Sequence, residues 1–194
     1  MIKLIFITIT FINLVVIQGC SPVGILASGG ATTMVVAEGD KSLGTVVDDA
    51  TIKLNLSTQF LKSENKFFLN INSNVTGGRV LLTGIVRSQE IRIEAVKTVW
   101  GISGVKEVMN EIEVGNSTTL KEYANDLWIN TQIKSLAAKT VGFRVISYNF
   151  ETIKGKVYIA GISSRPEQLQ KIINAIETVK GVKEIVNYVT LVEE

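Results

Sequence analysis

A single cysteine, Cys20, is the residue of this chain whose surroundings most clearly indicate a chemical modification. It follows one cation, Lys3, and an apolar run over residues 4–17 that is interrupted by three polar residues. This run is shorter than the roughly 20 residues that a membrane-spanning helix needs. A charged start, a short apolar middle and a small-residue end are typical of an export signal. We therefore predict a signal peptide over residues 1–19, directly before the thiol.

The residues around this thiol, Ile17-Gln18-Gly19-Cys20, resemble a bacterial lipobox, with Gln18 at a position where a small residue is usual. The resemblance implies that Cys20 forms a thioether to diacylglycerol and that the mature chain begins there, with its acyl chains in a membrane leaflet. Ser21 comes next, whereas Asp at this position retains lipoproteins in the inner membrane under the enterobacterial sorting rule. The resemblance thus implies a protein anchored in the outer membrane and facing the periplasm. The alternatives are an uncleaved membrane anchor and an ordinary signal peptide with an incidental cysteine.

The composition argues against catalysis and against metal binding. The chain has no histidine and one cysteine, so it can form neither a Ser-His-Asp or Cys-His arrangement nor a thiolate zinc cluster. Spare acids such as Asp48, Asp49 and Glu90 show no informative pairing, and Asp49 is expected near a helix start. With 20 Lys+Arg against 18 Asp+Glu, the chain has no overall basic field of the kind that marks nucleic-acid binders. We predict a protein that is not an enzyme, with no catalytic residues, no metal site, no nucleic-acid partner and no cofactor besides the covalent lipid on Cys20.

An internal repeat organises the rest of the chain. The segment GGRVLLTGIVRSQE at 77–90 matches KGKVYIAGISSRPE at 154–167, and GVKEVMNEIEV at 104–114 matches GVKEIVNYVTL at 181–191. Equivalent residues are separated by a constant 161 − 84 = 77 positions, as Gly84 and Gly161 show. A fixed period of this length indicates two tandem copies of one small domain.

Each copy shows the same order of elements. A first helix is predicted from apolar residues at helical spacing, which are Ile52, Leu56 and Phe60 in copy one and Ile129, Ile133 and Leu136 in copy two. The predicted strands and second helices are 67–75, 79–86, 89–100 and 105–114, then 144–152, 156–163, 166–178 and 182–192. Capping boxes are expected at Thr119…Glu122 and Ser164…Glu167. The order α-β-β-α-β predicts an α+β fold in which a three-stranded sheet packs against two helices.

The repeated motifs resemble those of the BON domain, a bacterial periplasmic module marked by V-x-L-x-G on one strand and G-V-x-x-V-x-N near its end. Here they are Val80–Gly84 with Gly104–Asn110, and Val157–Gly161 with Gly181–Asn187. Behind a lipobox, the pair resembles the dual-BON outer-membrane lipoproteins; the soluble dual-BON group lacks a lipobox. The resemblance implies two tandem BON domains, binding to phospholipid membranes, a role in outer-membrane integrity and no catalytic activity.

These observations divide the chain into four parts: signal peptide 1–19, lipidated N-terminus and tether 20–42, BON domain 1 over 43–115 and BON domain 2 over 116–194. Within the domains, the motif glycines are expected at turns. Asn110 and Asn187 are expected to satisfy local backbone groups rather than bind a ligand.

The largest difference between the copies lies in the first helix, where Ala50-Thr51 becomes Leu127-Trp128. On a helical wheel Trp128 shares a face with Lys121 and Lys139, Leu127 lies beside it, and Tyr123 lies beyond Leu127 as a lesser candidate. An indole flanked by lysines and next to leucine suits contact with anionic headgroups. The alternative is that Trp128 packs between the copies or on its own core. Trp100, which stands where copy two has Glu177, is expected in the core or between the repeats.

Two functions are consistent with these features. The first is a lipid-anchored envelope protein that binds anionic phospholipid through the second copy and supports outer-membrane integrity. The second is a scaffold or adaptor that binds envelope proteins but not lipid, with the anchor serving only for location.

Overall fold

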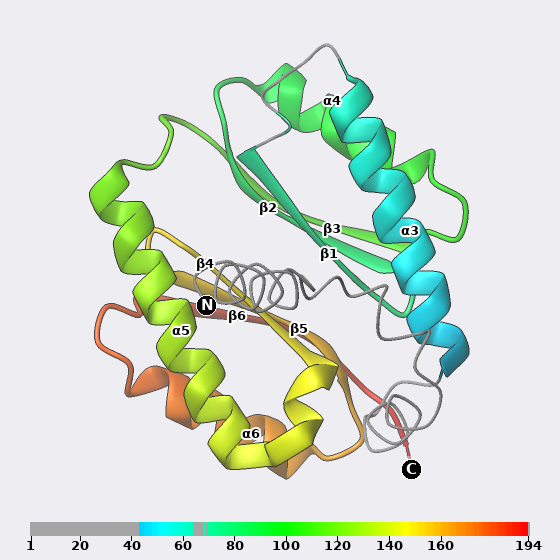
Figure 1. The fold of residues 1–194 in the computed structure, drawn as a ribbon. Helices are drawn as coiled ribbons and strands as arrows, with labels where there is room; N and C mark the ends of the chain where they lie inside the picture. The colour runs from blue at the N-terminus through cyan, green and yellow to red at the C-terminus, as the bar shows by residue number, and fades with distance from the viewer. Residues whose placement is uncertain (1–42, 64–67, 69, 194) are drawn as a thin grey trace, which may run out of the picture. The chain divides into compact units, whose positions relative to one another are not determined.

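The computed structural model of the chain describes residues 43–63, 68 and 70–193 (Figure 1). The predicted signal peptide, the tether and Cys20 lie outside the described residues. Two three-stranded sheets, each with its own helices, follow one another along the described part of the chain, which confirms the predicted α+β tandem.

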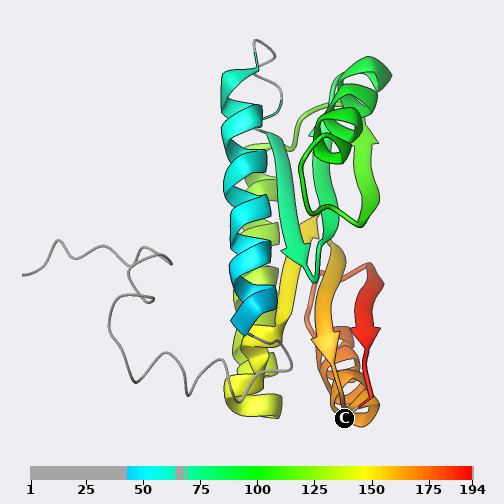
Figure 2. The ribbon, with the colours of Figure 1, turned by 90° about the vertical axis from the view of Figure 1, so that its right-hand side faces the viewer.

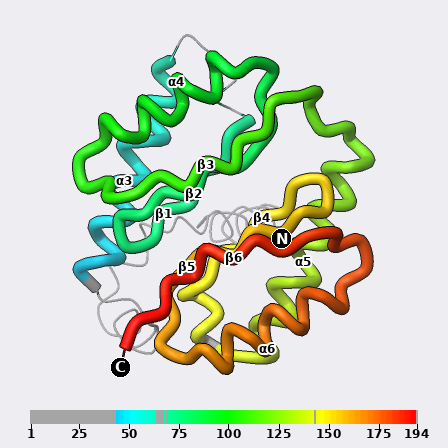
Figure 3. Tube along the Cα trace, turned by 180° about the vertical axis from the view of Figure 1, so that it is seen from behind, coloured from blue at the N-terminus to red at the C-terminus, as the bar shows by residue number. Residues whose placement is uncertain are grey.

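The first domain runs from α3 to β3. Its elements are α3 (Leu43–Lys62), β1 (Ile71–Thr76), β2 (Arg79–Val86), α4 (Gln89–Trp100) and β3 (Glu107–Val114). In the sheet, β2 is central, antiparallel to β1 and parallel to β3, and the three traces lie side by side in Figure 3. Both helices lie on one face of this sheet (Figure 1), and α3 runs along β1 (Figure 2). The predicted apolar stripe of α3, Ile52, Leu56 and Phe60, is buried in the core.

The second domain repeats this arrangement, and in both domains the first strand begins later than predicted, at Ile71 instead of residue 67 in the first domain. Its elements are α5 (Leu120–Val141), η3 (Gly142–Ser147), β4 (Tyr148–Ile153), β5 (Lys156–Ser163), α6 (Pro166–Glu177) and β6 (Glu184–Leu191). The strand predicted over 144–152 begins at Tyr148, because residues 142–147 form the 3-10 turn η3. On α5 the buried residues are Ile129, Ile133 and Ala137, whereas Leu136 is half-buried.

Each hairpin turn is held by a buried aspartate from the preceding helix. Gly77 and Gly78 have φ of 63° and 79°, the left-handed values that a tight two-residue turn between antiparallel strands requires. The Asp49 carboxylate accepts hydrogen bonds from both of their N–H groups, each at 2.9 Å. Asp126 does the same for the turn of the second domain, at 2.7 and 2.8 Å. The expected place of Asp49 near a helix start was wrong: it lies inside α3, and its carboxylate anchors the hairpin.

The two central strands are buried on both faces. Along β2, Val80 and Leu82 enter the core beneath the helices, whereas Leu81 points the other way. There it joins Met109 of β3 and Tyr158 of β5 in a cluster formed by both domains. A strand covered on both sides shows a continuous apolar run, which explains why β2 lacks the alternation of a half-exposed strand.

Polar contacts around this cluster are related by the repeat. Arg79 donates to the carbonyl oxygen of Tyr188 at 3.3 Å and to the Thr190 hydroxyl. Lys156, its equivalent 77 positions later, forms an ion pair with Glu111 of the first domain at 3.5 Å. The Tyr188 hydroxyl donates to Glu111 at 2.5 Å. Each domain thus extends a cation from the same strand position to the other domain.

The helix caps and the motif asparagines test the predictions at single residues. Thr119 and Glu122 form the predicted capping box of α5. The box predicted at Ser164…Glu167 was wrong, because α6 begins one residue later, with Arg165 as an N-cap that makes no side-chain capping bond. The asparagines behave as predicted: the Oδ1 atoms of Asn110 and Asn187 accept local backbone N–H groups, at 3.2 and 2.9 Å respectively.

Candidate functional site

The buried residues of α5 determine which of its side chains face solvent. Its capping box fixes the first turn: the Glu122 N–H donates to the Thr119 hydroxyl at 3.2 Å, and the Thr119 N–H donates to Glu122 Oε2 at 2.8 Å. The buried residues Ile129 and Ile133 turn the opposite side outward.

The outward side carries the residues predicted for membrane contact. Trp128 is 61% exposed and Leu127 is 57% exposed, so the indole packs neither in the core nor between the domains. Lys121 and Lys139 are also exposed. At a rise of about 1.5 Å per residue, Trp128 lies about 10 Å along the axis from Lys121 and about 16 Å from Lys139. The helix therefore presents an indole between two ammonium groups.

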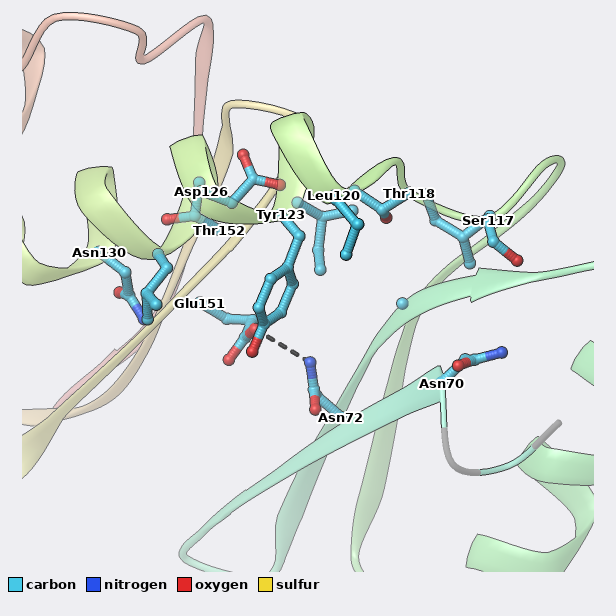
Figure 4. A pocket seen from close by; sticks show the side chains of 14 residues that line it. Asn70, Asn72, Ser117, Thr118, Leu120, Tyr123, Asp126, Asn130, Glu151 and Thr152 are labelled. Atoms are coloured by element: carbon cyan, nitrogen blue, oxygen red, sulfur yellow. Dashed lines mark hydrogen bonds between the residues drawn. The ribbon is translucent and has the colours of Figure 1, made fainter. Parts of the chain in front are cut away.

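The fifth predicted residue, Tyr123, lies away from this outward stripe. It lines a pocket of about 520 Å³ together with Leu120 and Leu127 of the same helix. The opposite walls come from the ends of β1 and β4, and Figure 4 shows Tyr123, Asn72 and Glu151 directed toward one another. Leu127 thus lies at the border between the outward stripe and the pocket.

The pocket contains one carboxylate that is not fixed by a turn. Asn72 donates to Glu151 Oε1 at 3.0 Å across the domain boundary. Burial raises the pKa of Glu151 above its ordinary value, and the charges of Lys134 and Lys53 partly offset this effect. Asp126 also lines the pocket, but its carboxylate is bonded to the hairpin turn.

Local sequence patterns contain little sign of this pocket. Its walls come from three segments, around residues 70–85, 117–130 and 151–153, that only the fold brings together. The available signal was divergence between the copies: Tyr123 and Asn130 stand where copy one has Val46 and Lys53.

Other surfaces show one correction and two negative results. Trp100 was expected in the core or between the repeats, but it is 54% exposed at the end of α4, so that prediction was wrong. Among the described residues, no group of three or more His, Cys, Asp or Glu side chains could hold a metal ion. No helix in the described part of the chain has the length and apolarity to cross a bilayer.

Comparison with known proteins places these features in context. The family model of the BON domain matches residues 48–116 and 125–193. The chain is 38% identical over 146 residues to an uncharacterized protein in the gshII 5′ region of Anaplasma centrale, covering 75% of this chain and 95% of that protein.

Two further relatives have descriptive names. The outer membrane lipoprotein DolP of Haemophilus influenzae is 30% identical over 176 residues, which cover 88% of this chain and 87% of that protein. A 21 kDa hemolysin of Actinobacillus pleuropneumoniae is 27% identical over 154 residues, which cover 79% of each chain.

Proposed function

Because the chain belongs to the BON-domain family, with two such domains in tandem, we propose that it is an envelope-associated lipoprotein that binds anionic phospholipid through α5 and supports outer-membrane integrity. The observation that carries this proposal is the exposure of Trp128 and Leu127 on a helix face flanked by Lys121 and Lys139. The proposed activity is binding rather than catalysis.

The physical chemistry of this face suits the surface of a bilayer. An indole favours the depth of the headgroups, and a leucine beside it can enter the acyl boundary. Each lysine near an anionic surface contributes about 1 kcal/mol, an effect that salt screens. Leu120 lies about two helical turns before Leu127 and is 88% exposed, so it adds apolar area to the same border.

The proposed anchor makes a weak contact sufficient. Acyl chains on Cys20 would hold the domains close to the leaflet, so that the helix binds at a high effective concentration. The name of the Haemophilus relative supports an outer-membrane location, and our proposal places the domains on the periplasmic side. The anchor then keeps the domains at the membrane, and the helix orients them on its surface.

A fragment of residues 21–194 tests lipid binding without the anchor, because both hydrophobic cores lie within residues 43–193. In a Trp100→Phe background, we expect the fluorescence of Trp128 to shift to the blue with phosphatidylglycerol vesicles and to change little with phosphatidylcholine vesicles. In vesicle sedimentation, Leu127→Ala combined with Trp128→Ala should weaken binding at least about tenfold, because the apolar part of the contact is lost.

Leu54→Ala is the matched control, because Leu54 is 67% exposed on α3, the equivalent helix of the first domain. It should leave vesicle binding unchanged. Equal binding by the double variant would contradict the proposed site. An absence of vesicle binding, together with specific envelope proteins crosslinked in cells, would favour the adaptor function instead.

A further inference from the structure

The pocket beside α5 has walls whose polar groups are mostly neutral. Three amides and three hydroxyls line it: Asn70, Asn72, Asn130, Ser117, Thr118 and Thr152. No lysine or arginine belongs to the lining in the described part of the chain. Such a wall offers hydrogen-bond donors and acceptors without a positive charge to fix an anion.

The carboxylates of the pocket do not make it a cation site. Asp126 is bonded to two backbone N–H groups, and Glu151 accepts from Asn72. The charges of Lys134 and Lys53 lower the pKa of Glu151, although burial raises it more. A ligand that is neutral and rich in hydroxyl groups therefore fits this field better than an ammonium group or a phosphate.

An aromatic ring forms part of the wall. Tyr123 is 62% exposed, and in Figure 4 its ring extends into the pocket with the hydroxyl end toward Glu151 and Asn72. Leu120 and Leu127 extend the apolar surface beside the ring. A sugar ring has apolar C–H faces and a polar rim, so it can lie against this ring while its hydroxyls reach the amides and Glu151.

Two lining residues also carry unmet hydrogen-bonding capacity. Asn130 Oδ1 and Thr152 Oγ1 are buried and have no hydrogen-bond partner among the described residues. Buried polar atoms are normally bonded to protein groups or ordered water, so these two atoms suit a water molecule that bridges from behind the pocket wall toward a ligand.

We propose that this pocket binds a neutral saccharide, with Tyr123 stacking on a sugar ring and Glu151, Asn72 and Asn130 bonding its hydroxyls. The cavity of about 520 Å³ accommodates one or two sugar rings. This site borders the proposed lipid contact and shares Leu120 and Leu127 with it, whereas Trp128 and the flanking lysines are not among the lining residues.

Heteronuclear NMR on residues 21–194 tests the proposal with two uncharged probes, N,N′-diacetylchitobiose and maltose, titrated to about 20 mM. We expect at least one probe to give saturable shifts of the backbone amides of Asn72, Tyr123 and Glu151. Tyr123→Ala should weaken that binding at least about tenfold by removing the stacking ring. Glu151→Gln, which keeps an acceptor for Asn72, should weaken it severalfold by replacing a charge-assisted bond.

Matched controls separate the pocket from the fold and from lipid binding. Trp100→Ala removes an exposed aromatic elsewhere, and Glu177→Gln neutralises an exposed acid at the end of α6. Both should bind the sugar as the unaltered fragment does, and so should Trp128→Ala, which is designed to lose vesicle binding. The proposal is overturned if neither probe gives saturable shifts. It is also overturned if the shifts lie elsewhere or are unaffected by Tyr123→Ala.

Discussion

Helices α3 and α5 occupy equivalent places in the two domains. The residues on their buried sides are alike, whereas the residues on their solvent-facing sides differ. Their buried sides match, as Ile52 with Ile129 and Asp49 with Asp126 show. Their outer sides differ, because Thr51 in α3 is replaced by Trp128 in α5. The comparison indicates that the frame, meaning the buried residues and turns that hold the fold, is the same in both copies. The solvent-facing side chains of the second copy differ from those of the first.

The largest test of the shared frame is at the central glycines of β2 and β5. A Cβ on Gly84 would lie 2.2 Å from the carbonyl oxygen of Asn70, and one on Gly161 would lie 2.2 Å from that of Ser147. Alanine at either position should therefore cost more than about 4 kcal/mol of unfolding free energy or prevent folding. Urea denaturation followed by circular dichroism measures this loss.

Gly115→Ala is the control for these substitutions, because a Cβ there would lie 3.9 Å from Ile85, an ordinary contact. Its effect should stay within about 0.5 kcal/mol. A large loss at one central glycine and a small loss at its equivalent would show that the two frames are not interchangeable.

The aspartates under the hairpin turns give the next largest effect. Asp49→Ala and Asp126→Ala each leave two backbone N–H groups without their carboxylate, so each should reduce the free energy of unfolding by about 3 kcal/mol. Urea denaturation measures the loss, and amide hydrogen exchange should show it confined to the altered domain. Asp48→Ala, at an exposed neighbouring position, is the control. A larger loss of unfolding free energy for Asp48→Ala than for Asp49→Ala would contradict the role of Asp49 in holding the turn.

The smallest effect concerns the pair Glu111 and Tyr188, which are equivalent in the repeat but differ in chemistry. Burial, with a further contribution from Glu111, raises the pKa of Tyr188 from 10.0 to about 12. Because the folded state holds this proton more tightly, the associated stability is complete below pH 10.0 and is lost as the pH rises toward 12. Tyr188→Phe should reduce this alkaline loss in urea denaturation across that range.

The exposed Tyr123 supplies the control for the alkaline experiment, because Tyr123→Phe removes a hydroxyl that no described hydrogen bond uses. Its free energy of unfolding at pH 7 should stay within about 0.5 kcal/mol of that of the unaltered protein. An unchanged slope in Tyr188→Phe would show that the contact between the domains does not depend on the protonated phenol.

Periodicity and the repeat predicted most of the frame, because local patterns determine it. The stripe of Ile52, Leu56 and Phe60 and the capping box at Thr119 follow from spacing along one helix. The role of Asp49 could not be predicted in this way, because its partners lie 28 and 29 positions later along the chain.

The two candidate sites also differ in how far local sequence patterns predict them. The exposure of Trp128 follows from its place on the helical wheel of α5, opposite the buried residues. The meeting of Tyr123 with Asn72 and Glu151 depends on how the two domains pack, which no local pattern reports. The prediction for Trp100 was wrong in the other direction: this large aromatic at a helix end was expected to be buried, and it is exposed.

The covering of each sheet on both sides has a consequence for how this protein can diversify. Helices cover one face of each sheet and the cluster around Leu81 and Tyr158 covers the other, so neither central strand faces solvent. The surface that other molecules meet therefore comes from the outer strands β3 and β6 and from the helices, on which every third or fourth residue is a neighbour. Among related proteins, changes of binding preference should gather at that spacing on the helices, while successive positions along the buried central strands change slowly.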